Sequence, residues 1–425
     1  MSRGNRLASI YIHIPFCAKK CRYCDFYSLP VGGERFVECS QHTGSLRRFA
    51  PRNDRHCERS EAIHGVDLKY NNTVVNQYIN SLIKEWRMYE FAGLLDCRDI
   101  DTIYIGGGTP SILGFDMWDR LDDGLFSRID KTVIKEWSIE CNPESFGIDK
   151  AKAYSKSGVT RLTFGVQSLN DRELSVCGRI HNSARALEVL RDGRLATMFN
   201  SIGVDIIYGL PGQNIDSLDA TLSSLLSIQH IKHISAYELT IAMNTPFGKH
   251  RKTLPRPDED TVAEMYELIG KRCAERGMRQ YEVSNYAIEG HESIHNKAYW
   301  SRKPYIGLGA AAHSYIHPKR WGNIEDADQY ISLISSNKRP IEFEEVLTNR
   351  ESAEEMIFLG LRNIDGIDKR EFEELTGNQL CDSGSDKEAR SLEYIEAGLL
   401  IDSGERLIPT SKGMLFADMM ARGIV

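Results

Sequence analysis

Residues 9–24 of this 425-residue chain read Ser-Ile-Tyr-Ile-His-Ile-Pro-Phe-Cys-Ala-Lys-Lys-Cys-Arg-Tyr-Cys. Isoleucine alternates with other residues over 9–14, which is the period of a β-strand with one apolar face. Cys17, Cys21 and Cys24 follow the strand with the spacing C-x3-C-x2-C. Three thiolates this close together on one loop can reach a common centre, so the stretch predicts a metal site directly after a strand.

The number of cysteines separates the kinds of metal site. Zinc sites usually have four protein ligands, often in paired C-x2-C knuckles, and a [4Fe–4S] cube normally takes four cysteines. Three cysteines leave one iron of a cube open to a small molecule. Three unrelated cysteines in a reducing compartment remain the alternative. The chain has ten cysteines, and the other seven are scattered: Cys39, Cys57, Cys97, Cys141, Cys177, Cys273 and Cys381.

Further strand-like runs follow along the chain, and helical patterns such as Ser183–Arg191 and Ser217–Leu226 separate them. Strands that alternate with helices predict βαβ units and a parallel sheet, so the fold class is α/β. The predicted strands after the first are Thr102–Ile105, Trp137–Cys141, Arg161–Val166, Val204–Tyr208 and His233–Leu239.

Polar or glycine residues end several of these strands. Gly106-Gly107-Gly108-Thr109-Pro110 comes directly after the second, where glycines leave room for a close ligand. Glu140 ends the third, and a carboxylate there can accept hydrogen bonds from hydroxyl or amino groups. Arg179 can pair bidentately with a carboxylate, and Asp205 is a charge in an apolar strand that needs a partner. Each alone is also compatible with a structural role.

The cysteine spacing, with Tyr23 inside it, closely resembles the radical S-adenosylmethionine (SAM) superfamily. In that family the three cysteines hold a [4Fe–4S] cluster whose open iron binds the amino and carboxylate groups of SAM. One-electron reduction then yields methionine and a 5′-deoxyadenosyl radical. The resemblance implies an incomplete (β/α)6, TIM-like barrel with its site at the carboxyl ends of the strands. It also implies SAM contacts at the matching positions: Tyr11, Gly107, Gly108, Thr109, Glu140, Gln167, Arg179 and Asp205.

Three motifs narrow the resemblance to one branch of the superfamily: Tyr-Ile-His-Ile-Pro-Phe, Gly-Val-Gln-Ser and Gly-Arg-Ile-His. This branch contains the oxygen-independent coproporphyrinogen III dehydrogenase and heme chaperones of the HemW type. The dehydrogenase carries a fourth cysteine two positions after the third, where this chain has Phe26, and a longer extension before the first strand. Both differences favour the chaperone.

A second motif, His295-Asn-Lys-Ala-Tyr299-Trp300, resembles the H-N-x-x-Y-W motif that the chaperone branch associates with heme binding. Imidazole is a good axial ligand for heme iron, and the two aromatic rings offer flat apolar faces for a porphyrin. A histidine and two aromatics packed at a domain junction are the alternative.

The resemblance therefore predicts a heme chaperone with three bound groups: a [4Fe–4S] cluster, SAM and heme. Its partner would be an acceptor hemoprotein. The rival is the anaerobic oxidative decarboxylation of coproporphyrinogen III in porphyrin biosynthesis, and a radical enzyme with another substrate is a third alternative. No catalytic residue is assigned, and whether the protein is an enzyme stays open.

The chain divides into three predicted segments. Residues 1–255 form the barrel, 256–341 extend it and carry the H-N-x-x-Y-W motif, and 342–425 form a helical, winged-helix-like domain with a hairpin across Asp402-Ser403-Gly404. Residues 32–66 are expected to be a disordered insertion. A zinc site there is an alternative, but the spacing of its candidate ligands fits no standard pattern: Cys39, His42, His56 and Cys57.

Charge and hydropathy argue against a nucleic-acid-binding, a membrane-spanning or a secreted protein. The formal net charge of −7 argues against nucleic-acid binding through the overall field, and the tail from Gly366 has twelve acidic and seven basic residues. This tail favours a docking module over a DNA-binding wing. Apolar runs are too short for a membrane span, and the start does not resemble a signal peptide, so we expect a cytoplasmic protein. A homodimer is left open.

Overall fold

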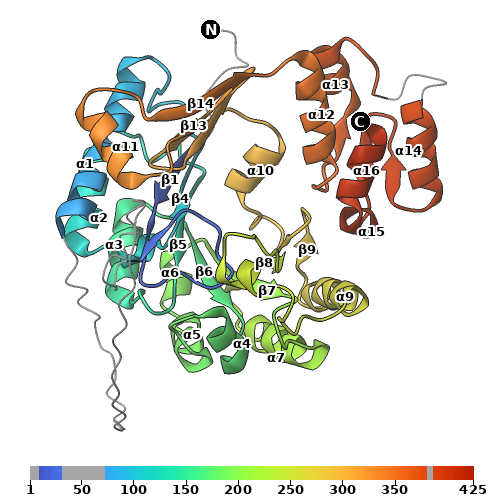
Figure 1. Ribbon diagram of the computed structural model, residues 1–425, viewed down its shortest axis with the longest axis horizontal. Helices are drawn as coiled ribbons and strands as arrows, with labels where there is room; N and C mark the ends of the chain where they lie inside the picture. The colour runs from blue at the N-terminus through green and yellow to red at the C-terminus, as the bar shows by residue number, and fades with distance from the viewer. Residues whose placement is uncertain (1–8, 31–71, 381–385) are drawn as a thin grey trace, which may run out of the picture.

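The computed structural model (Figure 1) describes residues 9–30, 72–380 and 386–425. Its main body is built on a twelve-stranded sheet with the order β14-β13-β12-β11-β1-β4-β5-β6-β7-β8-β10-β9. The expected insertion at 32–66, with its alternative zinc ligands, lies outside the described residues.

Seven neighbouring strands of the sheet run parallel and form an incomplete α/β barrel. The six strands expected from the sequence coincide with β1 and β4–β8. The seven are β11 (Tyr305–Leu308), β1 (Ser9–Ile14), β4 (Thr102–Gly107), β5 (Glu136–Cys141), β6 (Arg161–Gln167), β7 (Ser201–Tyr208) and β8 (Ile231–Glu238).

Antiparallel strands extend both edges of the parallel core. They are β12 (His313–Ile316), β13 (Lys319–Asn323) and β14 (Ile341–Val346) at one edge, and β10 (Asn285–Ala287) and β9 (Arg279–Gln280) at the other. Because β14 pairs with β13, the C-terminal unit begins after Val346 and not at the expected residue 342. A separate two-stranded sheet joins β2 (Phe16–Cys17) to β3 (Leu29–Pro30).

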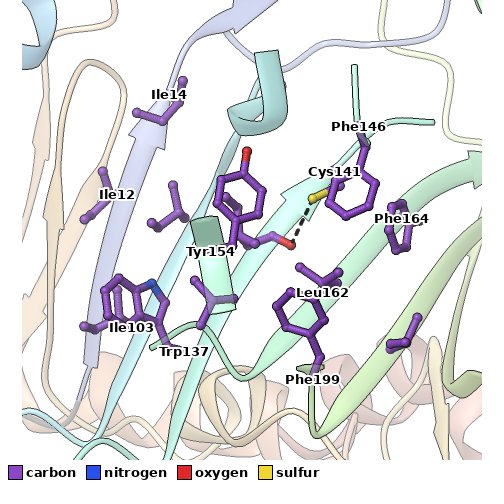
Figure 2. Packing of buried hydrophobic residues seen from close by; sticks show 14 of the residues in the cluster. Ile12, Ile14, Ile103, Trp137, Cys141, Phe146, Tyr154, Leu162, Phe164 and Phe199 are labelled. Carbon is purple, nitrogen blue, oxygen red and sulfur yellow. Dashed lines mark hydrogen bonds between the residues drawn. The ribbon is translucent and has the colours of Figure 1, made fainter. Parts of the chain in front are cut away.

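Helices cover the outer face of the sheet (Figure 1). They are α1 (Asn72–Phe91), α2 (Phe115–Leu121), α3 (Ile148–Ser157), α4 (Asp171–Cys177), α5 (Ser183–Leu190), α6 (Leu195–Met198), α7 (Ile215–Leu226), α9 (Glu259–Glu275) and α11 (Ala327–Ser335). Figure 2 shows part of the core beneath them, in which Trp137 and Leu162 from neighbouring strands pack in one cluster with Tyr154 of α3. This layer buries the apolar face that the alternation predicts.

The inner face of the parallel strands is polar. Successive side chains of a strand alternate between its two faces, so residues between the buried apolar positions face the barrel interior. Thr102 and Tyr104 do so on β4, Glu136 and Glu140 on β5, and Asp205 on β7. The short helix α10 (Ile294–Trp300) contacts β4 and lies between the sheet and the C-terminal unit (Figure 1).

The C-terminal unit has its own apolar core and a winged-helix-like arrangement. The predicted hairpin across Asp402-Ser403-Gly404 is confirmed as the turn between β16 and β17. Three backbone bonds join the unit to the barrel in the described part of the chain: from Leu347 N to Pro318 O, from Val283 N to Arg362 O and from Ile364 N to Tyr281 O. Its elements are α12 (Asn349–Gly360), β15 (Ile367–Asp368), α13 (Lys369–Thr376), α14 (Asp386–Glu396), β16 (Leu400–Asp402), β17 (Arg406–Pro409), α15 (Ser411–Leu415) and α16 (Ala417–Ile424).

In the described part of the chain, every helix is too short or too polar to cross a membrane.

Glu85 of α1 is a buried carboxylate that ties three later elements to this helix. Its Oε2 accepts hydrogen bonds from Gly309 N at 2.8 Å and Tyr330 Oη at 2.6 Å, and its Oε1 accepts one from Asn323 Nδ2 at 2.7 Å. Burial raises the pKa of Glu85 from its usual 4.5 to about 7, although the hydrogen bonds act in the opposite direction.

This raised pKa predicts a pH dependence of stability. The folded state holds the Glu85 proton more tightly than the unfolded state, so stability falls as the pH rises through the window from 4.5 to about 7. From about pH 5 to about pH 8, the wild type should lose about 1–3 kcal/mol more unfolding free energy than Glu85→Gln. Urea unfolding at both pH values measures this, with the exposed Glu188→Gln as control. Equal losses in wild type and Glu85→Gln would contradict it.

Candidate functional site

The three cysteines lie at one end of the barrel on a loop that is fixed at its centre. Cys17 ends β2, and Cys21 and Cys24 follow in the loop; all three are free thiols. Arg22 N donates to the carbonyl of Cys177 at the end of α4 at 2.9 Å. The Arg22 carbonyl accepts a bond of 3.0 Å from the backbone N of Phe247 in α8 (Pro246–Lys249). The loop is therefore held between two helices before any metal binds.

The chemistry of these thiols fits an iron–sulfur cluster. Burial raises the pKa of Cys17, and it raises the pKa of Cys24 to about 11, so metal binding must displace protons. Among the described residues, no three His, Cys, Asp or Glu side chains converge on a single metal ion. A cube binds each cysteine through a different iron, so it does not require such convergence.

A hydrogen-bonded chain of side chains connects two of the cysteines. Thr109 Oγ1 donates to Cys17 Sγ at 3.4 Å and accepts from Asn142 Nδ2 at 3.1 Å. Asn142 Oδ1 accepts from Arg179 Nη2 at 3.0 Å, and Arg179 Nη1 donates to Cys21 Sγ at 3.5 Å. The sequence-predicted Thr109 and Arg179 are therefore both placed against the cysteine loop, with Asn142 between them.

The glycine segment after β4 passes close to the strand that leads to the cysteines. Gly108 N donates to Ile14 O at 2.8 Å, and Thr109 N donates to Phe16 O at 2.7 Å. Gly107 has φ of 110°, and a Cβ there would lie 2.5 Å from the His13 ring. Only glycine fits this backbone and this space. The His13 ring occupies the space beside Gly107, so room for a ligand at these glycines stays a prediction.

Two half-buried carboxyl groups face the same space. Glu140 accepts a hydrogen bond from Tyr104 Oη at 2.7 Å and one from Gly107 N at 3.2 Å. Asp205 lies opposite Ser235 of β8, and its Oδ1 is buried without a partner. Burial raises the pKa of Glu140, and it raises that of Asp205 to about 7. An unpartnered buried carboxyl oxygen favours a ligand that brings hydroxyl or amino hydrogens.

The remaining predicted residues lie on the neighbouring strands. Gln167, the last residue of β6, has a left-handed backbone with φ of 71°, a strained conformation of the kind often found at functional sites. Tyr11 of β1 bonds His13 Nδ1 at 3.1 Å and stacks on Tyr104 with ring centroids 6.1 Å apart. The predicted SAM residues are thus distributed on or after β1, β4, β5, β6 and β7 and after α4.

Sequence reasoning missed four residues that shape this site: Tyr104, Asn142, Glu144 and His181. His181 Nδ1 and Arg179 Nη2 lie 2.8 Å and 3.9 Å from Glu144 Oε2, which orients the guanidinium group. His181 lies inside the Gly-Arg-Ile-His motif, and Asn142 lies two residues after Glu140, so their closeness to predicted site residues was the available signal. Tyr104 had no signal except its alternating position on β4.

The H-N-x-x-Y-W motif forms α10, and its histidine is buried against the start of β4. His295 is 1% exposed, with Nδ1 at 2.8 Å from Thr102 Oγ1 and Nε2 at 3.0 Å from Tyr299 Oη. Thr102 Oγ1 donates to Ser9 Oγ, so it accepts from His295 Nδ1–H. The Nε2 lone pair then accepts the Tyr299 hydroxyl proton. Both ring nitrogens of His295 are engaged in this arrangement.

The other end of α10 faces the C-terminal unit. Trp300 lines a cavity of about 400 Å³ together with Arg302, Met356 and Ile408. The side chains of the motif therefore point to two places. The histidine and tyrosine face the barrel, and the tryptophan faces the junction between the two units. Phe26, at the position of the dehydrogenase's fourth cysteine, is 66% exposed.

Comparisons with known proteins agree with the fold. The profile of the Radical SAM superfamily matches residues 77–225, and that of the HemN C-terminal domain matches residues 347–416. The solved structure of coproporphyrinogen III oxidase (HemN) from Escherichia coli has a TM-score of 0.77 at 18% identity, covering 99% of this chain and 90% of that one. The chain is therefore a radical SAM protein with a HemN-type C-terminal domain.

Individual relatives narrow this class to one family. The heme chaperone HemW of Bacillus subtilis (strain 168) is 32% identical over 378 residues, 88% of each chain, so this chain belongs to the HemW family. The HemW protein of Escherichia coli (strain K12) is 32% identical over 72% of this chain and 70% of its own. A mouse protein, mitochondrial radical S-adenosyl methionine domain-containing protein 1, is 30% identical over 74% of this chain and 62% of its own.

Proposed function

We propose that this protein is a heme chaperone that holds a [4Fe–4S] cluster and SAM, binds heme and transfers it to an acceptor hemoprotein. The observation that carries the choice over the dehydrogenase is Phe26, an exposed phenylalanine where the dehydrogenase has its fourth cysteine. The HemW names of the relatives support the same choice.

The residues at the strand ends have the chemistry that the two cofactors need. Cys17, Cys21 and Cys24 would hold the cluster, which supplies one-electron reduction of SAM when both are bound. The Arg179 guanidinium, already oriented by Glu144, would pair with the SAM carboxylate. Asp205, with its unpartnered oxygen, would accept hydrogen bonds from ligand hydroxyl or amino groups, as would Glu140.

Heme binding through the H-N-x-x-Y-W motif would require a rearrangement. The Nε2 of His295 accepts from Tyr299 in the described arrangement, so iron ligation by that nitrogen would replace this bond. The ring is 1% exposed, so α10 would have to move away from β4. Trp300, which lines the cavity at the junction, already presents an apolar ring for a porphyrin face.

Hemin titration tests the heme assignment. If His295 is the axial ligand, His295→Ala should bind hemin about tenfold more weakly or worse and shift the Soret band. Trp300→Ala should weaken binding while leaving the wild-type Soret position, because it removes a porphyrin contact and not a ligand. His250→Ala, which removes an exposed histidine, is the matched control and should behave as wild type.

Two results would contradict the proposal. Hemin binding by His295→Ala with unchanged affinity and spectrum would remove His295 as the ligand. Robust formation of protoporphyrinogen IX from coproporphyrinogen III, in an anaerobic assay with reductant and SAM, would favour the dehydrogenase over the chaperone.

A further inference from the structure

The stacking partner of His295 leads directly to the proposed SAM site. The imidazole lies 5.0 Å from the ring of Tyr104, centroid to centroid, with an interplanar angle of 28°. Tyr104 spans the inner face of the barrel, since its ring contacts α10 while its hydroxyl bonds Glu140 at 2.7 Å. The Tyr104 ring therefore physically joins the H-N-x-x-Y-W helix to a carboxylate of the SAM site.

Glu140 depends on this contact for its orientation. Its two described hydrogen bonds come from the Tyr104 hydroxyl and from the backbone N of Gly107 in the glycine segment. The Tyr104 ring itself stacks on two rings, those of His295 and Tyr11. Removing the imidazole would remove the nearer of these two stacking contacts and let the Tyr104 hydroxyl leave the Glu140 carboxylate.

Hydrogen bonds hold the imidazole in place in addition to its stacking on Tyr104. Thr102 and Tyr299 bond its two nitrogens, and Glu136 accepts the backbone N–H of His295 at 3.1 Å. Burial lowers the pKa of His295 to about 3, so the ring stays neutral at physiological pH. A neutral, doubly bonded ring is suited to hold a neighbouring side chain in place.

We infer that His295 is a positioning residue for SAM: through the Tyr104 ring it keeps Glu140 in the orientation that binds the cofactor. This inference rests on the proposed SAM site and adds a role for the motif that does not involve heme. It also means that heme ligation by His295 and tight SAM binding oppose each other, because ligation removes the ring from Tyr104.

The test is a double-mutant cycle in the full-length, cluster-reconstituted protein, with the SAM dissociation constant measured by equilibrium dialysis. His295→Ala and Glu140→Ala should each weaken SAM binding about tenfold, the usual effect of losing one hydrogen bond to a charged group. The double variant should bind SAM no more weakly than Glu140→Ala alone, because His295 acts through Glu140. A general structural role would instead multiply the two losses.

Two further variants separate stacking from other effects. His295→Phe keeps a ring against Tyr104, so it should restore SAM affinity to within about twofold of wild type while lacking any iron ligand. Lys297→Ala removes only the exposed pair with Asp365 on the same helix and should leave SAM affinity unchanged.

The outcomes distinguish two failures. If Glu140→Ala leaves SAM affinity unchanged, the proposed SAM site is wrong and this inference is overturned with it. If Glu140→Ala weakens binding but His295→Ala does not, or if the two losses multiply, the SAM site stands and only the positioning role is overturned.

Discussion

Replacing Cys17, Cys21 and Cys24 together with alanine should lower the iron content of the anaerobically reconstituted protein from about four per chain to near zero. In the proposed site each cysteine would bind a different iron, so single replacements should also prevent stable binding. Thr109 and Arg179 donate hydrogen bonds to two of these sulfurs, Cys17 Sγ and Cys21 Sγ. Iron and sulfide analysis, with the visible absorption spectrum, measures the result.

Cys97→Ser is the matched control for the cysteine variants. Cys97 lies outside the loop, where its thiol donates to Glu90 Oε1 at 3.0 Å, and serine keeps that donor. This variant should retain about four irons. Unchanged iron content in the triple variant would mean that the cluster assignment is wrong.

The sequence predicted the part of the site that is local in the chain. Cys17, Cys21 and Cys24 lie within one loop, and the alternation over Ser9–Ile14 places that loop after a strand whatever the rest of the fold does. The six parallel strands were predicted for the same reason, because each has an apolar face that a helix must cover.

The missed parts depend on contacts between distant residues. Tyr104 and His295 are far apart in the sequence, and only the approach of α10 to β4 stacks their rings. The strands β11–β13 were missed because they are short and their aromatic and histidine content lacks a clean period of two. β14 does begin with an alternation, Ile341-Glu-Phe343-Glu, but most of it was assigned to the helical C-terminal segment. The two faces of α10 could not be separated either, since a seven-residue helix gives too few turns to show which side chains meet which neighbour.

Glu136→Ala should lower the free energy of unfolding by about 3–5 kcal/mol, the usual cost of leaving one member of a buried ion pair alone. Glu136 Oε2 lies 3.6 Å from Arg161 Nη1, and the two side chains are 6% and 3% exposed. Its carboxylate also accepts three bonds at the start of α10, each of 3.1 Å, from Ser293 Oγ, Ile294 N and His295 N. The substitution therefore isolates the Arg161 charge and removes the acceptor that holds α10 against β5.

Glu136→Gln separates these two effects, because it keeps an oxygen for the α10 donors but removes the negative charge. It should lose less stability than Glu136→Ala and keep more SAM affinity, since α10 stays docked and His295 stays on Tyr104. Glu188→Ala breaks an exposed pair with Arg185 and should change unfolding by no more than about 0.5 kcal/mol. Urea unfolding followed by tryptophan fluorescence measures all three. Removing one partner of a buried ion pair leaves the other charge uncompensated and costs more than about 1 kcal/mol of unfolding free energy. A smaller loss for Glu136→Ala would therefore mean that the buried pair does not hold α10 in place.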